Sequence, residues 1–308
     1  MGQEKVFKVT LLGFILTFAG SILFSTKAIA VKLAFRHTEM NGLTLLALRM
    51  LFSLPFYIVA AFIASSKKDA APITSKQWTS IIILGLFGYY LSSLFDFLGL
   101  QYISAGLERL ILFLYPSFAV LINAYIFKQR VTPVQTIALL LTYAGIAWAF
   151  WGELRVDVNN PNFLWGSTLI FLCSVTFAVY LVGSGRLIPQ VGASRFTAYA
   201  MLAATAGIFL HFLFSEKISA IDISGSHIWY GIYLAIVATV LPTFMIASGM
   251  KQIGSNNVAI ISSIGPVSTI LQAHFILDEP LFVAQWGGTA LVIAGVLLTS
   301  RKSVKNLK

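Results

Sequence analysis

The sequence is divided into apolar stretches of about the length needed to cross a lipid bilayer, and this succession most constrains how the chain can fold. A membrane-spanning helix needs roughly 20 mainly apolar residues. By this measure we predict ten transmembrane helices in an all-α integral membrane protein. They are expected at Val9–Val31, Leu43–Ala64, Trp78–Leu100, Gly106–Phe127, Pro133–Trp151, Phe163–Val182, Phe196–Phe214, Trp229–Met250, Asn257–Leu277 and Leu281–Ser300.

Composition supports a membrane protein independently of these boundaries. The chain is 58% hydrophobic and 10% charged, whereas soluble domains carry roughly 25% charged residues. The net charge of +10 raises the question of a nucleic-acid partner. The basic residues, however, are dispersed at the ends of the apolar stretches, which favours a role in topology and no nucleic acid. Cys173 is the single cysteine, so a disulfide framework and a cysteine metal site are excluded.

The first apolar stretch follows the polar N-terminal segment MGQEKVFKVT. It is too long for the core of a signal peptide, and no clear cleavage site follows it. We therefore interpret it as the first span.

Part of the first half of the chain recurs in the second half without a gap. A recurrence near half the chain length indicates duplication and fusion. With five helices per copy, the second copy enters the membrane from the opposite side, which predicts two inverted five-helix repeats. The recurring residues are Gly99, Pro116, Gln135 and Ala144-Gly145, matched by Gly249, Pro266, Gln285 and Ala294-Gly295. The predicted division is residues 1–151, first repeat; 152–162, connecting loop; 163–300, second repeat; and 301–308, basic cytoplasmic tail.

Charges in the connections give the expected orientation. One alternate set of connections holds most of the Lys and Arg residues, including both chain ends, and the other set holds most of the Asp and Glu residues. Lys and Arg accumulate on the cytoplasmic side of membrane proteins. We therefore expect a multi-pass protein of the cell (cytoplasmic or inner) membrane with both termini in the cytoplasm.

Three segments resemble a known family. The second half contains PVSTILQAHFILDEPLFVAQWGGTALVIAGVLL, and the first half contains TLLALRMLF and GLQYISAGLERLILFLYPSFAVL. They are similar to the EamA family of the drug/metabolite transporter superfamily. The resemblance implies ten helices in two inverted repeats and export of amino acids or other small metabolites. The chain departs from the family at Lys128-Gln129-Arg130, where the family often has a glutamate, so no role for that glutamate carries over.

Lys27 is the first candidate for a functional residue inside the membrane. Ionisable groups at membrane depth usually face the bundle interior or a wet cavity. Lys27 shares one stripe of the first helix with Gly13 and Gly20. Such small residues let another helix approach closely, which places Lys27 against protein. It could attract a carboxylate, or it could extend toward the membrane interface.

A polar face along the third predicted helix carries the next candidates. Asp96 could bind a substrate ammonium, carry a coupling proton or serve as a structural partner for Lys27 or Arg109. We expect Glu108 to be an ordinary helix-start residue, and adjacent side chains such as Glu108 and Arg109 are not expected to pair. The residues expected to line the cavity are Lys27, Tyr89, Tyr90, Ser93, Asp96, Arg109, Tyr180 and Ser263.

Prolines and two charged residues receive other roles. Pro116, Pro242 and Pro266 each fall near the middle of a predicted span, where a proline bends the helix and leaves a carbonyl open, and the alternative to gating is a simple kink. We interpret Glu279, in the sequence Asp-Glu-Pro, as a structural residue at a helix entry. Arg49 is also interpreted as structural, because nothing on its helix face is polar.

These features favour a secondary transporter and not an enzyme. The expected activity is transport of a small polar metabolite through a central cavity, with amino acids as the first guess. The expected partners are this small-molecule substrate and a coupling proton or other ion, unless the transport is facilitated. No cofactor or metal is expected, since His211 and His274 lack ligand spacing and the P-loop motif is absent. The alternatives are a non-transporting membrane sensor or assembly partner and an integral-membrane lipid enzyme. Glycines in the last helix could pack within the bundle or against a second copy in a homodimer.

Overall fold

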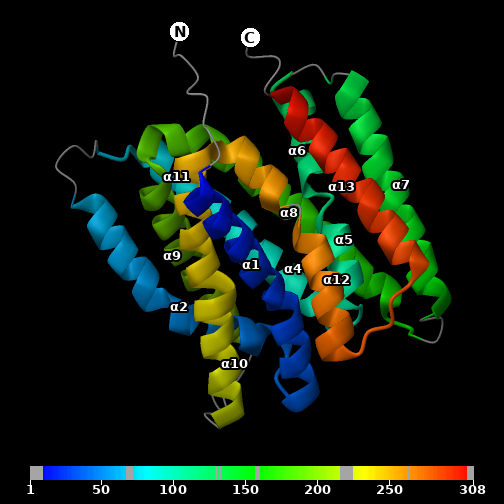
Figure 1. Cartoon of the computed structure of the whole chain (residues 1–308). Helices are drawn as coiled ribbons and strands as arrows, with labels where there is room; N and C mark the ends of the chain where they lie inside the picture. The colour runs from blue at the N-terminus through cyan, green and yellow to red at the C-terminus, as the bar shows by residue number, and fades with distance from the viewer. Residues whose placement is uncertain are drawn as a thin grey trace.

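The computed structural model of the protein describes residues 10–66, 72–128, 131, 133–156, 160–215, 225–262 and 264–303, and all the regular secondary structure in these residues is helical. Figure 1 labels the helices. In the first half they are α1 (Leu11–His37), α2 (Gly42–Ser65), α3 (Ser75–Gly85), η1 (Leu86–Leu91), α4 (Ser92–Gly99), α5 (Ala105–Leu112), α6 (Tyr115–Ile126) and α7 (Pro133–Val156). In the second half they are α8 (Phe163–Val191), α9 (Ala193–Ser215), α10 (Gly225–Ala235), η3 (Ile236–Val240), α11 (Leu241–Ser262), α12 (Ile264–Leu277) and α13 (Val283–Ser303).

Seven helical stretches in the described chain are long and apolar enough to cross a membrane. Three further apolar helices are shorter: Leu139–Gly152, Ile264–Leu277 and Val283–Gly295. The chain is therefore an all-helical, multi-pass membrane protein. The seven long stretches are Leu11–His37, Gly42–Ser65, Ser75–Gly99, Ala105–Ile126, Phe163–Val191, Ala193–Ser215 and Gly225–Ile246.

Several predicted boundaries are wrong by more than a turn. α8 continues to Val191 and ends where Gly192 adopts φ 86°, a conformation that suits glycine. α11 is helical through the stretch between Met250 and Asn257 that was expected to be a loop. α7 runs to Val156, so its last turn uses residues assigned to the connecting loop. Hydropathy locates apolar length, whereas a helix continues through polar residues wherever its backbone bonds remain intact.

Irregular helix geometry occurs at matching places in the two halves. The π-helical segment Leu86–Leu91 interrupts the third predicted span, and Ile236–Val240 interrupts the eighth. The two π segments are related by the same offset as Pro116 and Pro266. In the first half α5 and α6 are separated at Phe113–Leu114, whereas the matching position in the second half, residue 263, lies outside the described residues. Each π segment rotates the helix that follows it relative to a regular α-helix.

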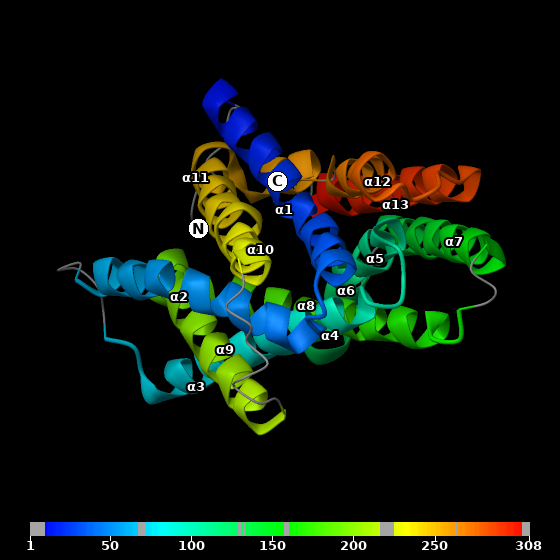
Figure 2. The ribbon, with the colours of Figure 1, turned by 90° about the horizontal axis from the view of Figure 1, so that it is seen from below.

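Helix packing also follows a reciprocal pattern. α1 packs against α11 and α12 of the second half, while α8 packs against α4 and α6 of the first half. α3 packs on α9, and α10 packs on α2. Seen from below, α1 crosses the middle of the molecule between the other elements (Figure 2).

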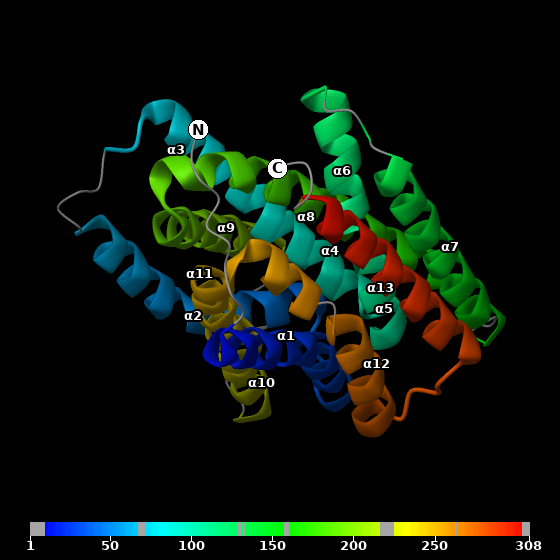
Figure 3. The same cartoon turned by 45° about the horizontal axis from the view of Figure 1, so that its top comes forward.

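The longest mutual contact joins α7 and α13, which lie side by side along one edge of the molecule (Figure 3). A Cβ placed on Gly288 would lie 2.5 Å from the carbonyl oxygen of Gly145, and Gly287 faces the ring of Trp148. These two glycines of α13 thus pack inside the bundle, where small residues allow backbones to touch.

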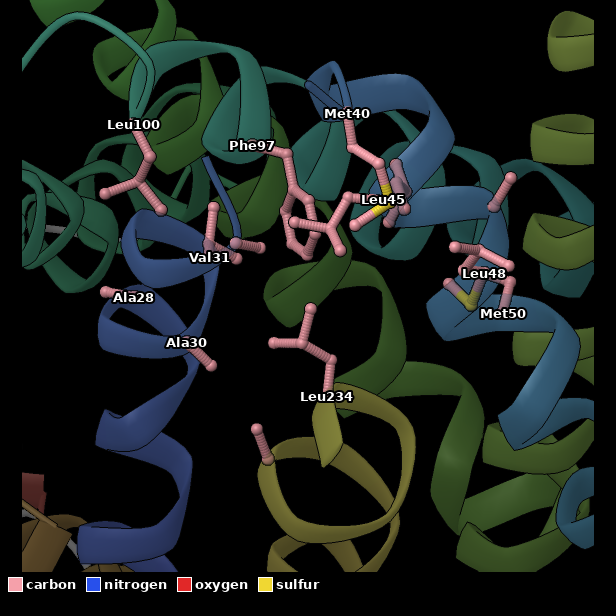
Figure 4. Packing of buried hydrophobic residues seen from close by; sticks show 14 of the residues in the cluster. Ala28, Ala30, Val31, Met40, Leu45, Leu48, Met50, Phe97, Leu100 and Leu234 are labelled. Carbon is pink, nitrogen blue, oxygen red and sulfur yellow. The ribbon is translucent and has the colours of Figure 1, made fainter. Parts of the chain in front are cut away.

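Apolar side chains from α1, α2, α4 and α10 form the largest core cluster. In Figure 4, Phe97 lies between Val31 and Leu45, and Leu234 points toward them from below. Phe97 and Leu45 are fully buried. In a bilayer such packing stabilises the fold through dispersion contacts more than through release of water. This core holds the second half of α1 against α4.

Candidate functional site: a buried ionic cluster

Lys27 reaches protein because α1 packs closely on its neighbours. Gly13 faces Ile253, and Gly20 faces Met245 and Ile246, all of α11. Lys27 lies further along the same stripe and is only 7% exposed. The close approach that the two glycines predict is therefore present, and it places the ammonium among protein groups.

Asp96 is the nearest partner of Lys27. The Lys27 Nζ atom lies 2.6 Å from Asp96 Oδ2 and 3.9 Å from Glu108 Oε1. Asp96 and Glu108 are 1% and 0% exposed. One ammonium thus bridges carboxylates from α4 and α5. Glu108 lies in the first turn of α5, as predicted, and Ser104 provides the N-cap. Glu108 is not an ordinary helix-start residue, however, because it is fully buried and lies near Lys27.

Arg109 completes the cluster and connects it to the second half of the chain. Its Nε atom lies 3.9 Å from Glu108 Oε2 and donates a hydrogen bond of 3.0 Å to Thr269 Oγ1 of α12. Adjacent side chains were not expected to pair. The flexible arginine nonetheless spans the angle between neighbouring positions, although 3.9 Å is at the long limit of an ion pair. We call Lys27, Asp96, Glu108 and Arg109 the ionic cluster.

The ionic cluster is charge-balanced but not saturated with hydrogen bonds. Two cations face two carboxylates, as buried charges require. Within the described chain, both Glu108 oxygens, Asp96 Oδ1 and Arg109 Nη2 are buried and have no hydrogen-bond partner. Buried polar atoms are normally satisfied. These atoms therefore give the cluster capacity to bind both an ammonium and a carboxylate.

Tyr89 and Tyr180 form a second group. Their hydroxyls are 2.7 Å apart and their rings pack at 4.8 Å. Phe177 and Phe196 pack on Tyr180, and Phe177 also contacts Tyr115. The result is an aromatic surface contributed by η1, α6, α8 and α9.

The remaining predicted residues are distributed over separate contacts. Tyr90 points to α9, where its hydroxyl lies 3.0 Å from His211 Nδ1. Ser93 accepts a 3.3 Å hydrogen bond from Arg49. Ser263 lies outside the described residues. The eight residues predicted to share one cavity are therefore divided, with Lys27, Asp96 and Arg109 together.

Arg49 has polar partners, so the stated reason for its structural role is wrong. Its Nε atom donates a hydrogen bond of 2.9 Å to Thr239 Oγ1 of η3, and its guanidinium lies 5.5 Å from the ring centroid of Phe97. These partners come from other helices, which a single helix face does not reveal. Arg49 links α2 and α4 to the second half.

The three prolines lie in different helical settings. Pro116 is in the first turn of α6, directly after the separation from α5, where a proline loses no intrahelical hydrogen bond. Pro242 directly follows the π-helical segment η3 within the continuous helical stretch Gly225–Ile246, where it removes one backbone donor. Pro266 lies in α12 and is buried.

Glu279 caps a helix other than the expected one. Its carboxylate accepts hydrogen bonds from the backbone N–H groups of Ala105 and Gly106, at 3.0 and 3.4 Å. The neighbouring Asp278 adopts φ 56°. The connection between α12 and α13 thus places its acid on the N-terminus of α5, where the helix dipole favours negative charge.

Two surface hollows lie away from the ionic cluster. One, of about 400 Å³, lies between α6 and α8, and the other, of about 320 Å³, lies between α3 and α8. Neither is lined by any of the eight predicted cavity residues. The four residues of the ionic cluster are at most 7% exposed, so other side chains enclose the cluster in this conformation.

An all-helical membrane bundle with a buried, charge-balanced cluster at the junction of its halves has the architecture of a solute transporter. Sequence comparison agrees with this class. The chain belongs to the EamA-like transporter family, which matches residues 11–151 and 164–301.

Relatives with similar length span bacteria and archaea. The chain is 30% identical over 304 residues to the uncharacterized transporter YcbK of Bacillus subtilis, covering 95% of both proteins. It is 22% identical to the uncharacterized inner membrane transporter YicL of Salmonella typhimurium, covering 94% of this chain and 96% of YicL. An uncharacterized transporter of Archaeoglobus fulgidus is 24% identical, with 93% and 94% covered.

The fold is also found in a solved structure. One crystal structure superimposes on 93% of this chain and 95% of its own, with a TM-score of 0.65 and 20% identity. The family match and the relatives identify a membrane transporter, whereas the solved structure shows a shared fold. Substrate and direction are left to be argued from the site.

Proposed function

We propose that the protein is a secondary transporter that exports amino acids or similar small zwitterionic metabolites. The observation that carries the proposal is the buried ionic cluster with its unsatisfied hydrogen-bonding atoms. A zwitterion would place its ammonium against Asp96 or Glu108 and its carboxylate against Lys27 or Arg109. Each buried charge then exchanges one partner for another, which avoids leaving a charge unpaired.

Alternating access between two inverted five-helix repeats is the proposed mechanism. The matching π segments and the reciprocal packing of α1 and α8 support two equivalent halves. The cluster connects them through the Arg109–Thr269 hydrogen bond. In this mechanism the Arg109–Thr269 hydrogen bond breaks and forms again as the two halves rock against each other.

The described conformation is proposed to be closed on the outer side. α1 begins and α13 ends at one end of the bundle, whereas α12 ends at the opposite end (Figure 1). If both chain ends are cytoplasmic, as the charge distribution predicts, the ionic cluster and the Glu279 cap lie in the outer half. The contacts within the ionic cluster and the contact of Glu279 with α5 would then have to open before a solute could leave the cell.

Counterflow in proteoliposomes tests the proposal. Vesicles loaded with a mixture of unlabelled amino acids should accumulate a labelled one only when the protein is present. Lys27→Met and Glu108→Gln should each raise the amino-acid concentration that gives half-maximal transport by roughly 10- to 100-fold. The reason is that a hydrogen bond to a charged group contributes about 1.5–3 kcal/mol.

Exposed charges provide the controls. Arg36→Met and Glu39→Gln remove the same charges from exposed positions and should transport normally. Absence of flux for every amino acid and for other small polar solutes would favour the sensor or assembly alternative.

A further inference from the structure

The last turns of α8 border both surface hollows, and Arg186 belongs to each of them. The larger hollow is lined by Ala119 and Asn123 of α6 and by Leu181, Val182, Gly185 and Arg186 of α8. The smaller one is lined by Ser80, Ile83 and Leu84 of α3 and by Gly183, Arg186, Leu187 and Gln190 of α8. One cation thus stands between two grooves on the surface of the bundle.

The walls of the larger groove are amphipathic. Leu181 and Val182 provide apolar surface, and Leu181 is 39% exposed. A Cβ on Gly185 would meet no atom within 4 Å, so the groove is open at that point. A molecule that joins an apolar chain to a polar head matches such walls.

Arg186 is positioned to hold the polar head. It is exposed, and it has no acidic partner in the part of the chain that the structure describes. Its guanidinium carbon lies 3.1 Å from the centroid of the Phe127 ring, which fixes the plane of the group. A guanidinium held in one plane matches a phosphate through two parallel hydrogen bonds.

The groove lies toward one end of the helical bundle. It is bordered by the last turns of α6 and α8, and α6 ends at the same end of the bundle at which α1 begins (Figure 1). The charge distribution predicts that this end is cytoplasmic, where anionic lipids attract basic groups. Basic pockets between membrane helices on that side commonly bind lipid phosphates.

We propose that the groove between α6 and α8 binds an anionic phospholipid. The phosphate contacts Arg186, and an acyl chain lies along Leu181 and Val182. This site is separate from the ionic cluster and does not depend on the transported solute. Its occupant would connect the cytoplasmic half of α6 to α8, which belong to different halves of the chain.

Lipid retention by the purified protein tests the proposal. Native mass spectrometry would follow titration with phosphatidylglycerol and, separately, phosphatidylcholine of the same acyl chains. Wild-type protein should retain phosphatidylglycerol preferentially. Arg186→Gln should lower its apparent affinity at least about fivefold, the effect of one surface cation on an anionic lipid. Arg186→Lys should lose less, since the charge remains.

Matched variants separate the site from general effects. Arg36→Gln removes an equal charge from the last turn of α1, far from the groove, and should leave lipid retention unchanged. Gly185→Leu keeps the arginine but fills the groove, so it should reduce retention as well. If Arg186→Gln does not fold, Gly185→Leu and Arg186→Lys still test the idea.

Three outcomes would overturn the proposal. The first is equal retention of phosphatidylglycerol by wild type and Arg186→Gln. The second is retention in Gly185→Leu that matches wild type. The third is competition by glycerol 3-phosphate as strong as that by short-chain phosphatidylglycerol, because the site would then be one for a water-borne anion.

Discussion

Removal of Lys27 should destabilise the protein more than removal of an exposed cation, and removal of Asp96 should restore part of the loss. The Lys27 ammonium lies 2.6 Å from Asp96 and 3.9 Å from Glu108. With an effective dielectric constant near 20, these distances correspond to gross attractions of about 6 and 4 kcal/mol. Desolvation offsets much of this, and breaking a buried pair by removing one partner typically costs about 3–5 kcal/mol.

Lys27→Met would leave two buried carboxylates facing one arginine. We therefore expect a loss of about 3–5 kcal/mol and a midpoint of thermal unfolding lowered by roughly 5–15 °C. Lys27→Met/Asp96→Asn removes both charges of the closest pair and should recover at least about 2 kcal/mol relative to the sum of the single variants.

Cys173 provides the assay. It is the single cysteine, and it is 2% exposed. A thiol-reactive fluorophore in detergent would report its exposure as the protein unfolds on heating. Arg36→Met is the matched control, because it removes an exposed cation from the same helix. Equal midpoints for Lys27→Met and Arg36→Met, or simple additivity in the double variant, would refute the assigned pairing.

Four further predictions follow from the same geometry. Asp96→Asn should abolish pH-driven accumulation but retain exchange, and accumulation that persists in proteoliposomes would exclude proton coupling through this residue. Pro116→Ala or Pro266→Ala should lower flux at unchanged membrane level, so normal flux in both would remove their gating role. Glu279→Gln should lower stability by about 1 kcal/mol, as expected for a lost charged cap, measurable as an earlier unfolding midpoint. Gly288→Leu should prevent close contact of α13 with α7 and reduce the amount of folded protein in detergent, and a normal yield would contradict that packing.

The sequence predicts the apolar segments well because hydropathy is a local property. It also brings Lys27, Asp96 and Arg109 into one candidate set, since each is a costly charge within an apolar segment. Glu108 satisfies the same criterion, but its position at a helix start suggested a simpler explanation. Glu108 could have been identified as a candidate by the same reasoning, because burying any charged side chain in an apolar segment is costly.

The polar face of the third predicted span could not be placed correctly by helical periodicity alone. That face assumed 3.6 residues per turn from Gly85 to Gly99, and η1 interrupts the regular turn. Tyr89 accordingly meets Tyr180, Ser93 meets Arg49 and Asp96 meets Lys27. Partners contributed by distant helices, such as Thr239 and Thr269, follow from tertiary packing and leave no local pattern.

The contact of α7 with α13 has a practical consequence for measuring motion. Because the peptide backbones meet at Gly145 and Gly288, these two helices offer a common frame of reference. Spin labels or fluorophores attached to their outward-facing residues would serve as fixed landmarks. Distances from those landmarks to labels on α1 or α6 would then report movement of the latter elements and not distortion of the frame.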